Sequence, residues 1–207
     1  YAAYGTGWDD VAGTDPAKSG LAEEALTLAA MLVHLVADAA EAWGLLALLA
    51  FCQSRVRARR DAAGDYVPLA AQDASLWDRE LLALAESALA RAAALGAPGA
   101  FQLEAAIQSA HAQRRLGADV PATAIVALYD ALVALQPTLG AIVSRACAVA
   151  DAHGAAAGLA ALAAIDPKDV RSYQPYWAAL AHLAAARGDA ATASAARERA
   201  VGLSTDP

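Results

Sequence analysis

Cysteine is scarce in this chain, and its scarcity excludes a fold held together by disulfides. Cys52 and Cys147 are the only cysteines among 207 residues, and both lie within apolar helical patterns. Small secreted domains that rely on disulfides are much richer in cysteine. We therefore expect two buried free thiols and a cytoplasmic location. No basic segment followed by an apolar run opens the chain, so no signal peptide is expected.

Long uninterrupted apolar runs are also missing, although the composition is apolar overall. Hydrophobic residues make up 58% of the chain and the mean hydropathy is +0.36. No stretch without charge, residues 42–54 (AWGLLALLAFCQS) included, reaches the roughly 20 residues of a membrane-spanning helix. Much of the apolar content is alanine, which favours helix as well as burial. The sequence predicts no contact with a membrane.

An excess of positive charge is absent as well. Lys and Arg total 15 against 22 Asp and Glu, which gives a net charge of −7 and a pI near 5.0. Proteins that bind nucleic acid without sequence specificity need a cationic surface to neutralise phosphates. We therefore expect no direct nucleic-acid binding by this chain.

No pattern of catalytic or metal-binding residues is present. The histidines are isolated in their helices, without the spacing of a metal site and without a partner cysteine. No glycine-rich phosphate loop and no nucleophile elbow occur. The sequence predicts a protein that is not an enzyme and that needs no cofactor or metal. The four histidines are His34, His111, His153 and His182.

Strong helical patterns, punctuated by Gly and Pro, fill most of the chain. No segment shows the β-branched alternation of a strand, so the fold class is all-α, built from antiparallel helix pairs with short connections. Asp38–Glu41 is predicted to form a capping box at the second helix. Helices are expected over about 16–36, 39–60, 75–95, 99–115, 121–135, 138–153, 155–165, 172–187 and 189–203.

Internal similarity predicts a tetratricopeptide-like helical array. Gly154 and Gly188 are 34 residues apart, which is the period of that repeat, and Trp43 and Trp177 open similar helices. An ordinary bundle of alanine-rich hairpins is the alternative. We treat residues 1–207 as one helical-repeat domain, with an aromatic and glycine-rich segment at 1–14, an ordered non-helical insert at 61–74 and a last hairpin at 171–207.

The insert and its flanks are the least repeat-like part of the chain. Four arginines end the second helix in RVRARR, and an acidic, tryptophan-bearing segment opens the next. The arginines either contact a phosphate-bearing partner or stabilise a helix C-terminus beside nearby aspartates. Trp77 is either a packing anchor or an interaction hot spot. The candidate interaction residues are Arg57, Arg60, Tyr66, Asp73, Trp77, Asp78 and Arg79.

The order of these features resembles the long C-terminal extension of one group of extracytoplasmic-function (ECF) RNA polymerase sigma factors. The resemblance is carried by YAAYGTGW at 1–8, the arginine-rich end at 55–60, QDxSxWDR at 72–79, FQLEAAIQSAHA at 101–112, LYDAL at 128–132 and AGLAAL at 157–162. It implies a role in transcription initiation. The promoter-binding domains of such sigma factors are not visible in these residues.

Two functions from different classes remain open. The first is a protein-interaction or autoregulatory domain, whose partners are the promoter-binding domains of the same sigma factor or RNA polymerase. The alternative is a free-standing helical-array sensor or adaptor that binds a small apolar molecule or peptide and shifts between two states. Thermal stability across a panel of metabolites would distinguish the second function from the first.

Overall fold

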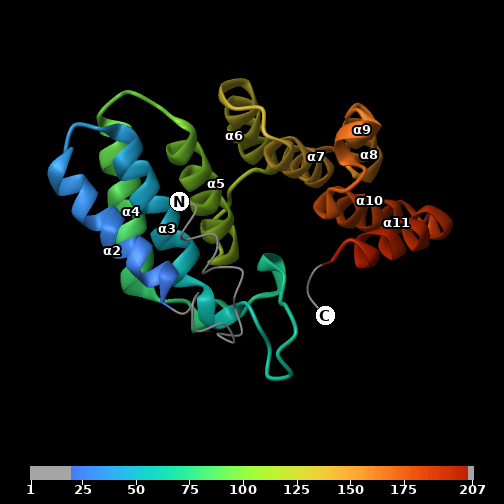
Figure 1. The fold of residues 1–207 in the computed structure, drawn as a ribbon, viewed down its shortest axis with the longest axis horizontal. Coiled ribbons are helices and arrows are strands. Elements are labelled where there is room, and N and C mark those ends of the chain that lie inside the picture. The colour runs from blue at the N-terminus through green and yellow to red at the C-terminus, as the bar shows by residue number, and fades with distance from the viewer. Residues whose placement is uncertain (1–19, 205–207) are drawn as a thin grey trace. The chain divides into compact units, whose positions relative to one another are not determined.

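The structure is a computed structural model, and it describes residues 20–204 (Figure 1). Within that range it contains ten α-helices and no β-strand, so the all-α prediction is confirmed. The predicted aromatic and glycine-rich segment at 1–14 and the helix start at Asp15-Pro16 lie outside the described residues. No described helix has both the length and the apolar character needed to cross a bilayer.

The chain is divided into two compact units, Tyr1–Asp119 and Val120–Pro207. This differs from the single helical-repeat domain that the sequence analysis assumes. Each unit buries a hydrophobic core of its own: Leu46, Leu49 and Phe51 belong to the first core, and Val143 and Leu162 belong to the second. A repeat period read from sequence cannot reveal this division, because it reports local similarity and not which faces pack together.

Unit 1 is built around α3. Its helices are α2 (Leu21–Leu35), α3 (Ala40–Ser54), α4 (Arg79–Ala94) and α5 (Ala100–Arg115). The α3 helix contacts α2, α4 and α5. Ten of its 15 residues are buried. A helix that is apolar around its whole circumference must be covered on all sides, so the other three helices surround it.

A glutamate of α3 caps a different helix. The capping box predicted at Asp38–Glu41 does not form, because α3 begins after Ala39, which makes no side-chain cap. The Glu41 carboxylate instead accepts hydrogen bonds from the backbone N–H groups of Phe101 and Gln102, each at 3.1 Å. These are two of the N–H groups that the first turn of α5 leaves without a helical partner. A Cβ at Gly99 would collide with Glu41, so glycine there admits the carboxylate.

Replacing Glu41 with alanine is expected to lower the free energy of unfolding of unit 1 by about 1–3 kcal/mol, because two half-buried N–H groups lose a charged acceptor. Urea unfolding followed by circular dichroism would measure the loss. Glu24→Ala is the matched control, since Glu24 is an exposed acid in the first turn of α2. Equal stability of the two variants would contradict the capping role.

Unit 2 is a succession of helical hairpins. It comprises α6 (Ala122–Leu135), α7 (Leu139–His153), α8 (Ala155–Ala163), the short α9 (Pro167–Val170), α10 (Gln174–Arg187) and α11 (Ala190–Gly202). Gly154 and Gly188 reverse the chain with φ of 91° and 85°, a conformation that favours glycine. The predicted last hairpin at 171–207 corresponds to α10 and α11.

The α10 helix packs on both α7 and α8, as expected for a stack of helix pairs. It contributes Ala179 and Leu183 to a core that also contains Val143, Ala146 and Leu162. Gly158 of α8 allows this close packing, because a Cβ there would lie 2.8 Å from the Ala146 carbonyl oxygen and 2.9 Å from Leu183 Cδ1.

The two tryptophans that open similar helices in the sequence also make similar hydrogen bonds. Trp43 and Trp177 each occupy the fourth position of their helices, α3 and α10. Trp43 Nε1 donates to the Ala37 carbonyl at 2.9 Å, and Trp177 Nε1 donates to the Val170 carbonyl at 3.0 Å. In both places the indole ties the first turn of a helix to the chain that enters it.

Candidate functional site

The insert, residues 61–74, begins as a tight hairpin. Arg60 and Tyr66 form an isolated antiparallel bridge, and Val67 N–H donates to the Arg59 carbonyl at 2.8 Å. Gly64, with φ of 89°, turns the chain between them. The insert contains no α-helix, in agreement with the sequence, although it has a short 3-10 turn at Leu69–Ala71. It projects from the helices of unit 1 as the teal loop in Figure 1.

The second half of the insert is tied to α5 through Gln72. This side chain is buried, and its Nε2 donates to the Val67 carbonyl at 3.1 Å. The Gln72 carbonyl accepts two hydrogen bonds from the Arg115 guanidinium, at 2.8 and 2.6 Å. Arg115 was not among the predicted residues, since nothing in the sequence links it to a position 43 residues earlier. The insert is therefore an ordered element of unit 1.

Trp77 is an anchor in this arrangement. Only 4% of the residue is exposed, and it forms a small core with Ala58 and Ala112. Leu69 of the insert and Leu82 of α4 pack against the same core. This favours the packing interpretation of Trp77 over the hot-spot interpretation, because a buried side chain offers little surface to a partner.

The aspartates beside Trp77 serve as caps. Asp78 accepts from the N–H groups of Glu80 and Leu81, both at 3.0 Å, and so caps the start of α4. Asp73 accepts from Ser75 N–H at 2.8 Å, and this backbone hydrogen bond holds the pKa of Asp73 below its usual value. Asp78 N–H also donates to the Ser54 carbonyl at 2.8 Å, which brings the end of α3 to the start of α4.

The four arginines do not form one cationic face. Arg55 and Arg59 are buried, Arg60 is half-buried, and Arg57 is exposed. Arg55 Nε donates to the Phe51 carbonyl at the end of α3 at 3.2 Å, and its Nη2 donates to Gln108 Oε1 at 2.6 Å. Arg60 Nη1 donates to the Gly64 carbonyl at 2.7 Å. The contact of Arg55 with a helix C-terminus agrees with the structural interpretation of these side chains.

The candidate residues thus separate into a buried anchor and an exposed set. Tyr66 is 59% exposed on the hairpin. Arg57, Asp73 and Arg79, which precede and follow it in the sequence, are also exposed. Backbone hydrogen bonds on both sides of Tyr66 hold the hairpin in one conformation. The insert therefore presents charged and aromatic groups on a backbone that is already ordered.

The metal-ligating side chains of the described residues do not gather in one place. Between residues 20 and 204, no group of three or more His, Cys, Asp or Glu side chains could hold a metal ion. Cys52 and Cys147 are free, as predicted, but are half-buried where full burial was expected. Burial raises the pKa of both thiols, which keeps them protonated at neutral pH.

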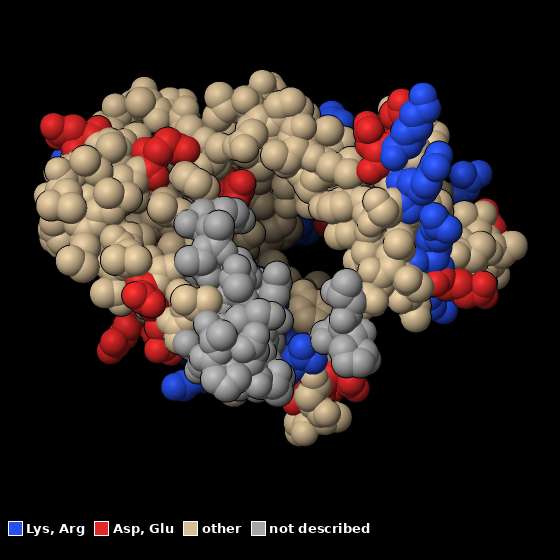
Figure 2. Space-filling view, viewed as in Figure 1, with Lys and Arg blue, Asp and Glu red and all other residues tan. Residues whose placement is uncertain are grey.

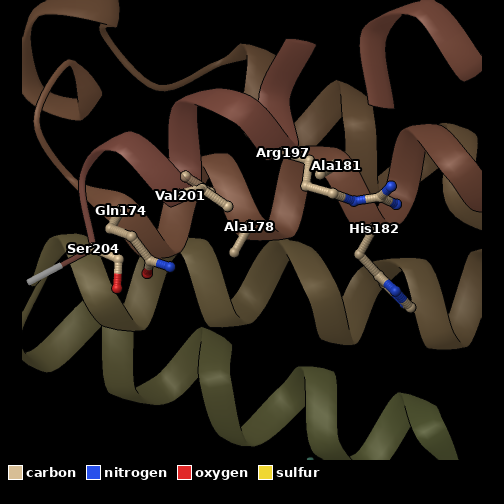
Figure 3. Close-up of a pocket in the computed structure, with 8 residues that line it drawn as sticks. Gln174, Ala178, Ala181, His182, Arg197, Val201 and Ser204 are labelled. Atoms are coloured by element: carbon tan, nitrogen blue, oxygen red, sulfur yellow. The ribbon is translucent and has the colours of Figure 1, made fainter. Parts of the chain in front are cut away.

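Unit 2 carries a second feature that the sequence analysis did not identify. A groove of about 480 Å³ runs between α10 and α11. Figure 3 shows His182 and Arg197 toward one end of it, Gln174 and Ser204 at the other, and Ala178 and Val201 between them. Only the small residues of α10 signal this groove in the sequence, and alanine is too common in this chain for that signal to be specific.

Comparison with known proteins gives two matches. A model of a family of unknown function, DUF6596, matches residues 1–93. An uncharacterized protein of Rhizobium meliloti (strain 1021) is 34% identical over 208 residues, which cover 100% of this chain and 48% of the relative. The chain therefore spans about half the length of that curated relative. No solved structure matches the chain.

Proposed function

We propose that the chain is the C-terminal interaction and autoregulatory domain of an ECF-type RNA polymerase sigma factor. In this role it regulates transcription initiation by docking on the promoter-binding domains of the same sigma factor or on RNA polymerase. The observation that carries the proposal is the insert, in which Tyr66 and charged neighbours project from a backbone held by hydrogen bonds and by Trp77.

The physical argument concerns the cost of binding. When a loop becomes ordered only on binding, the entropy lost in ordering it lowers the affinity. The hairpin at residues 60–67 is already closed, so Tyr66 can contact a partner at a small entropic cost. Tyrosine and arginine are enriched among residues that dominate binding energy. Arg57, Tyr66 and Arg79 are the exposed residues of these two types in and beside the insert.

The resemblance to sigma-factor extensions supports the same proposal. Its most specific portions, residues 55–79 and 101–112, include the insert and the helix that holds it through Arg115. The relative from Rhizobium meliloti is about twice as long as this chain, a length that leaves room for two small promoter-binding domains.

The proposal is tested by the intact mass of the native gene product from its source cells. We expect a mass well above 21.0 kDa, with promoter-binding domains joined to this chain. A native protein of about that mass, without such domains, would contradict the sigma-factor assignment.

Replacing Tyr66 with alanine is expected to weaken binding to the promoter-binding domains or to RNA polymerase by about tenfold or more, as loss of a hot spot does. The melting temperature should change little, because the side chain is 59% exposed. Biolayer interferometry with each partner would measure affinity. Leu35→Ala, at an 81% exposed position of α2, is the control. Binding that Tyr66→Ala leaves intact would exclude the hairpin as the contact.

A further inference from the structure

The α10–α11 hairpin carries a surface that the insert does not account for. We propose that the groove between α10 and α11 docks an amphipathic helix of a partner protein, with small side chains along its contact face and carboxylates beside them. This inference goes beyond the proposed function, because it assigns a second surface and the chemistry of its partner. It stands on unit 2 alone.

The first argument is that α10 has two distinct packing faces. Tyr176, Ala179, Leu180 and Leu183 face the core formed with α7 and α8. The groove residues of α10 follow a separate helical stripe at positions 174, 178, 181 and 182. Because 3.6 residues make one turn, this stripe lies on a different side of the helix from the core stripe.

The second argument is an internal precedent for the occupant. The preceding helix pair, α7 and α8, accepts α10, and small residues allow the close approach: Gly158 of α8 and Ala146 of α7 lie at that contact. The groove of the α10–α11 pair has small residues in its floor, Ala178, Ala181 and Ala200, beside larger ones at its edges. In the same unit, the surface formed by α7 and α8 already binds a helix, α10. We therefore expect the occupant of the α10–α11 groove to be a helix as well.

The third argument is charge. The whole chain carries −7, yet residues 166–204, from the cap of α9 onward, contain five cationic side chains against four carboxylates, a net charge of +1. Figure 2 shows Lys and Arg gathered in a band over α9 to α11. These cationic side chains attract an acidic partner. Because salt screens charges, the attraction is strongest at low ionic strength. The cations are Lys168, Arg171, Arg187, Arg197 and Arg199.

The groove itself supplies two of the groups that would meet carboxylates. Arg197 and His182 lie toward the same end of it (Figure 3). Arg197 is exposed, and among the described residues it makes no hydrogen bond or ion pair, so its guanidinium is available. Arg199, by contrast, lies over the Trp177 ring at 5.4 Å and donates to the Arg171 carbonyl at 3.1 Å. Arg197 is therefore the residue that selects acidic side chains.

The length of the groove limits how much of a docked helix can be in contact with it. Positions 174 to 182 of α10 span about 12 Å at 1.5 Å per residue, or a little over two helical turns. The docked segment would place alanine, glycine or serine opposite Ala178, the exposed alanine of the groove. Its aspartate or glutamate side chains would face Arg197 and His182.

Three designed peptides of about 20 residues test the proposal, since shorter helices are marginal in water. Each carries alanine along one face, with glutamate, glutamine or lysine on the flanks and a fluorescein label. Fluorescence anisotropy with the 207-residue chain should show the glutamate peptide binding at least tenfold more tightly than the other two. Added salt should reduce this preference. Equal binding of the three peptides, or no binding up to about 1 mM, would overturn the proposal.

Variants locate the contact. Arg197→Glu should weaken binding of the glutamate peptide by about tenfold or more, and Ala178→Trp should abolish it by filling the groove. Arg91→Glu makes the same charge change on an exposed residue of α4, and Ala186→Trp adds the same bulk at an exposed position of α10 outside the groove.

If the controls lose as much affinity as the groove variants, the groove is not the site. Self-association abolished by Arg197→Glu would assign the groove to a second copy and overturn the separate partner.

The same variants separate this inference from the proposed function. If the promoter-binding domains and RNA polymerase fail to bind while the glutamate peptide binds through Arg197, the sigma-factor proposal fails and the groove inference stands. If those partners bind through Tyr66 and the peptide binding is unaffected by Arg197→Glu, the groove inference alone fails.

Discussion

Replacing Trp77 with alanine is expected to lower the free energy of unfolding of unit 1 by about 3–5 kcal/mol, the usual cost of removing a large aromatic side chain from a core. Trp77 is 4% exposed, and Ala58, Ala112, Leu69 and Leu82 pack around it. Ala58 and Ala112 are too small to fill the cavity that alanine would leave. The variant should therefore approach the full cost for a core aromatic.

Urea unfolding followed by circular dichroism measures this loss, and Trp77→Phe provides the matched control. Phenylalanine keeps most of the apolar contact and removes Nε1, which is buried and has no hydrogen-bond partner among the described residues. Its cost should therefore be well below that of alanine. If Trp77→Ala retained full stability and lost only partner binding, the packing role assigned here would be wrong.

Loss of Trp77 has a further consequence for the insert. The same small core contains Leu69 and Ala74, so the second half of the insert loses its apolar contacts with α5 and η1 (Val56–Ala58) when the indole is removed, and keeps the hydrogen bonds from Arg115 to Gln72. The hairpin that presents Tyr66 would then be less ordered. Partner binding should fall in Trp77→Ala through the cost of ordering the insert, whereas Tyr66→Ala should reduce binding at unchanged stability.

Gly44→Ala is expected to destabilise unit 1 by about 1–3 kcal/mol, the typical cost of overpacking. A Cβ at this position of α3 would lie 2.6 Å from the backbone nitrogen of Gln102 and 2.9 Å from its Cα. These are backbone atoms at the start of α5, and they cannot rotate away. The two helices would have to separate, although alanine by itself favours helix over glycine by up to about 1 kcal/mol.

Gly202→Ala is the matched control for this prediction. Gly202 ends α11, and a Cβ there would meet no atom within 4 Å. The same substitution should leave stability unchanged or raise it by up to about 1 kcal/mol. The comparison isolates the steric contact from helix propensity. If Gly44→Ala stabilised the protein as much as Gly202→Ala, close packing of α3 on α5 would be contradicted.

Local chemistry in the sequence was sufficient for the helices and many of their ends. The turns at Gly154 and Gly188 are predicted and occur in the structure, and the cap at Asp78 is of the same local kind. Each depends on residues within one or two turns of the chain: a glycine that adopts positive φ, or a carboxylate that accepts from the N–H groups two and three residues later. Such features can be read from sequence because the interacting groups are neighbours.

The candidate site was only partly accessible to the same reasoning. The sequence located the insert and singled out Trp77, but it left open whether the indole is buried or presented to a partner. Burial decided that question, and burial depends on Ala112 of α5, which is 35 positions away in the chain. The role of Arg115 as a donor to Gln72 also had no sequence signal.

What the sequence by itself determined about this protein is its all-α class, the position of its turns and the unusual character of residues 61–74. The tertiary structure decided that Glu41 caps α5 and not its own helix, that the chain forms two units, and that α10 and α11 leave a groove. The physical reason is the sequence separation over which each interaction acts. Helix periodicity and capping act over a few residues, whereas burial, charge clustering and grooves arise only when distant helices pack and leave particular faces uncovered.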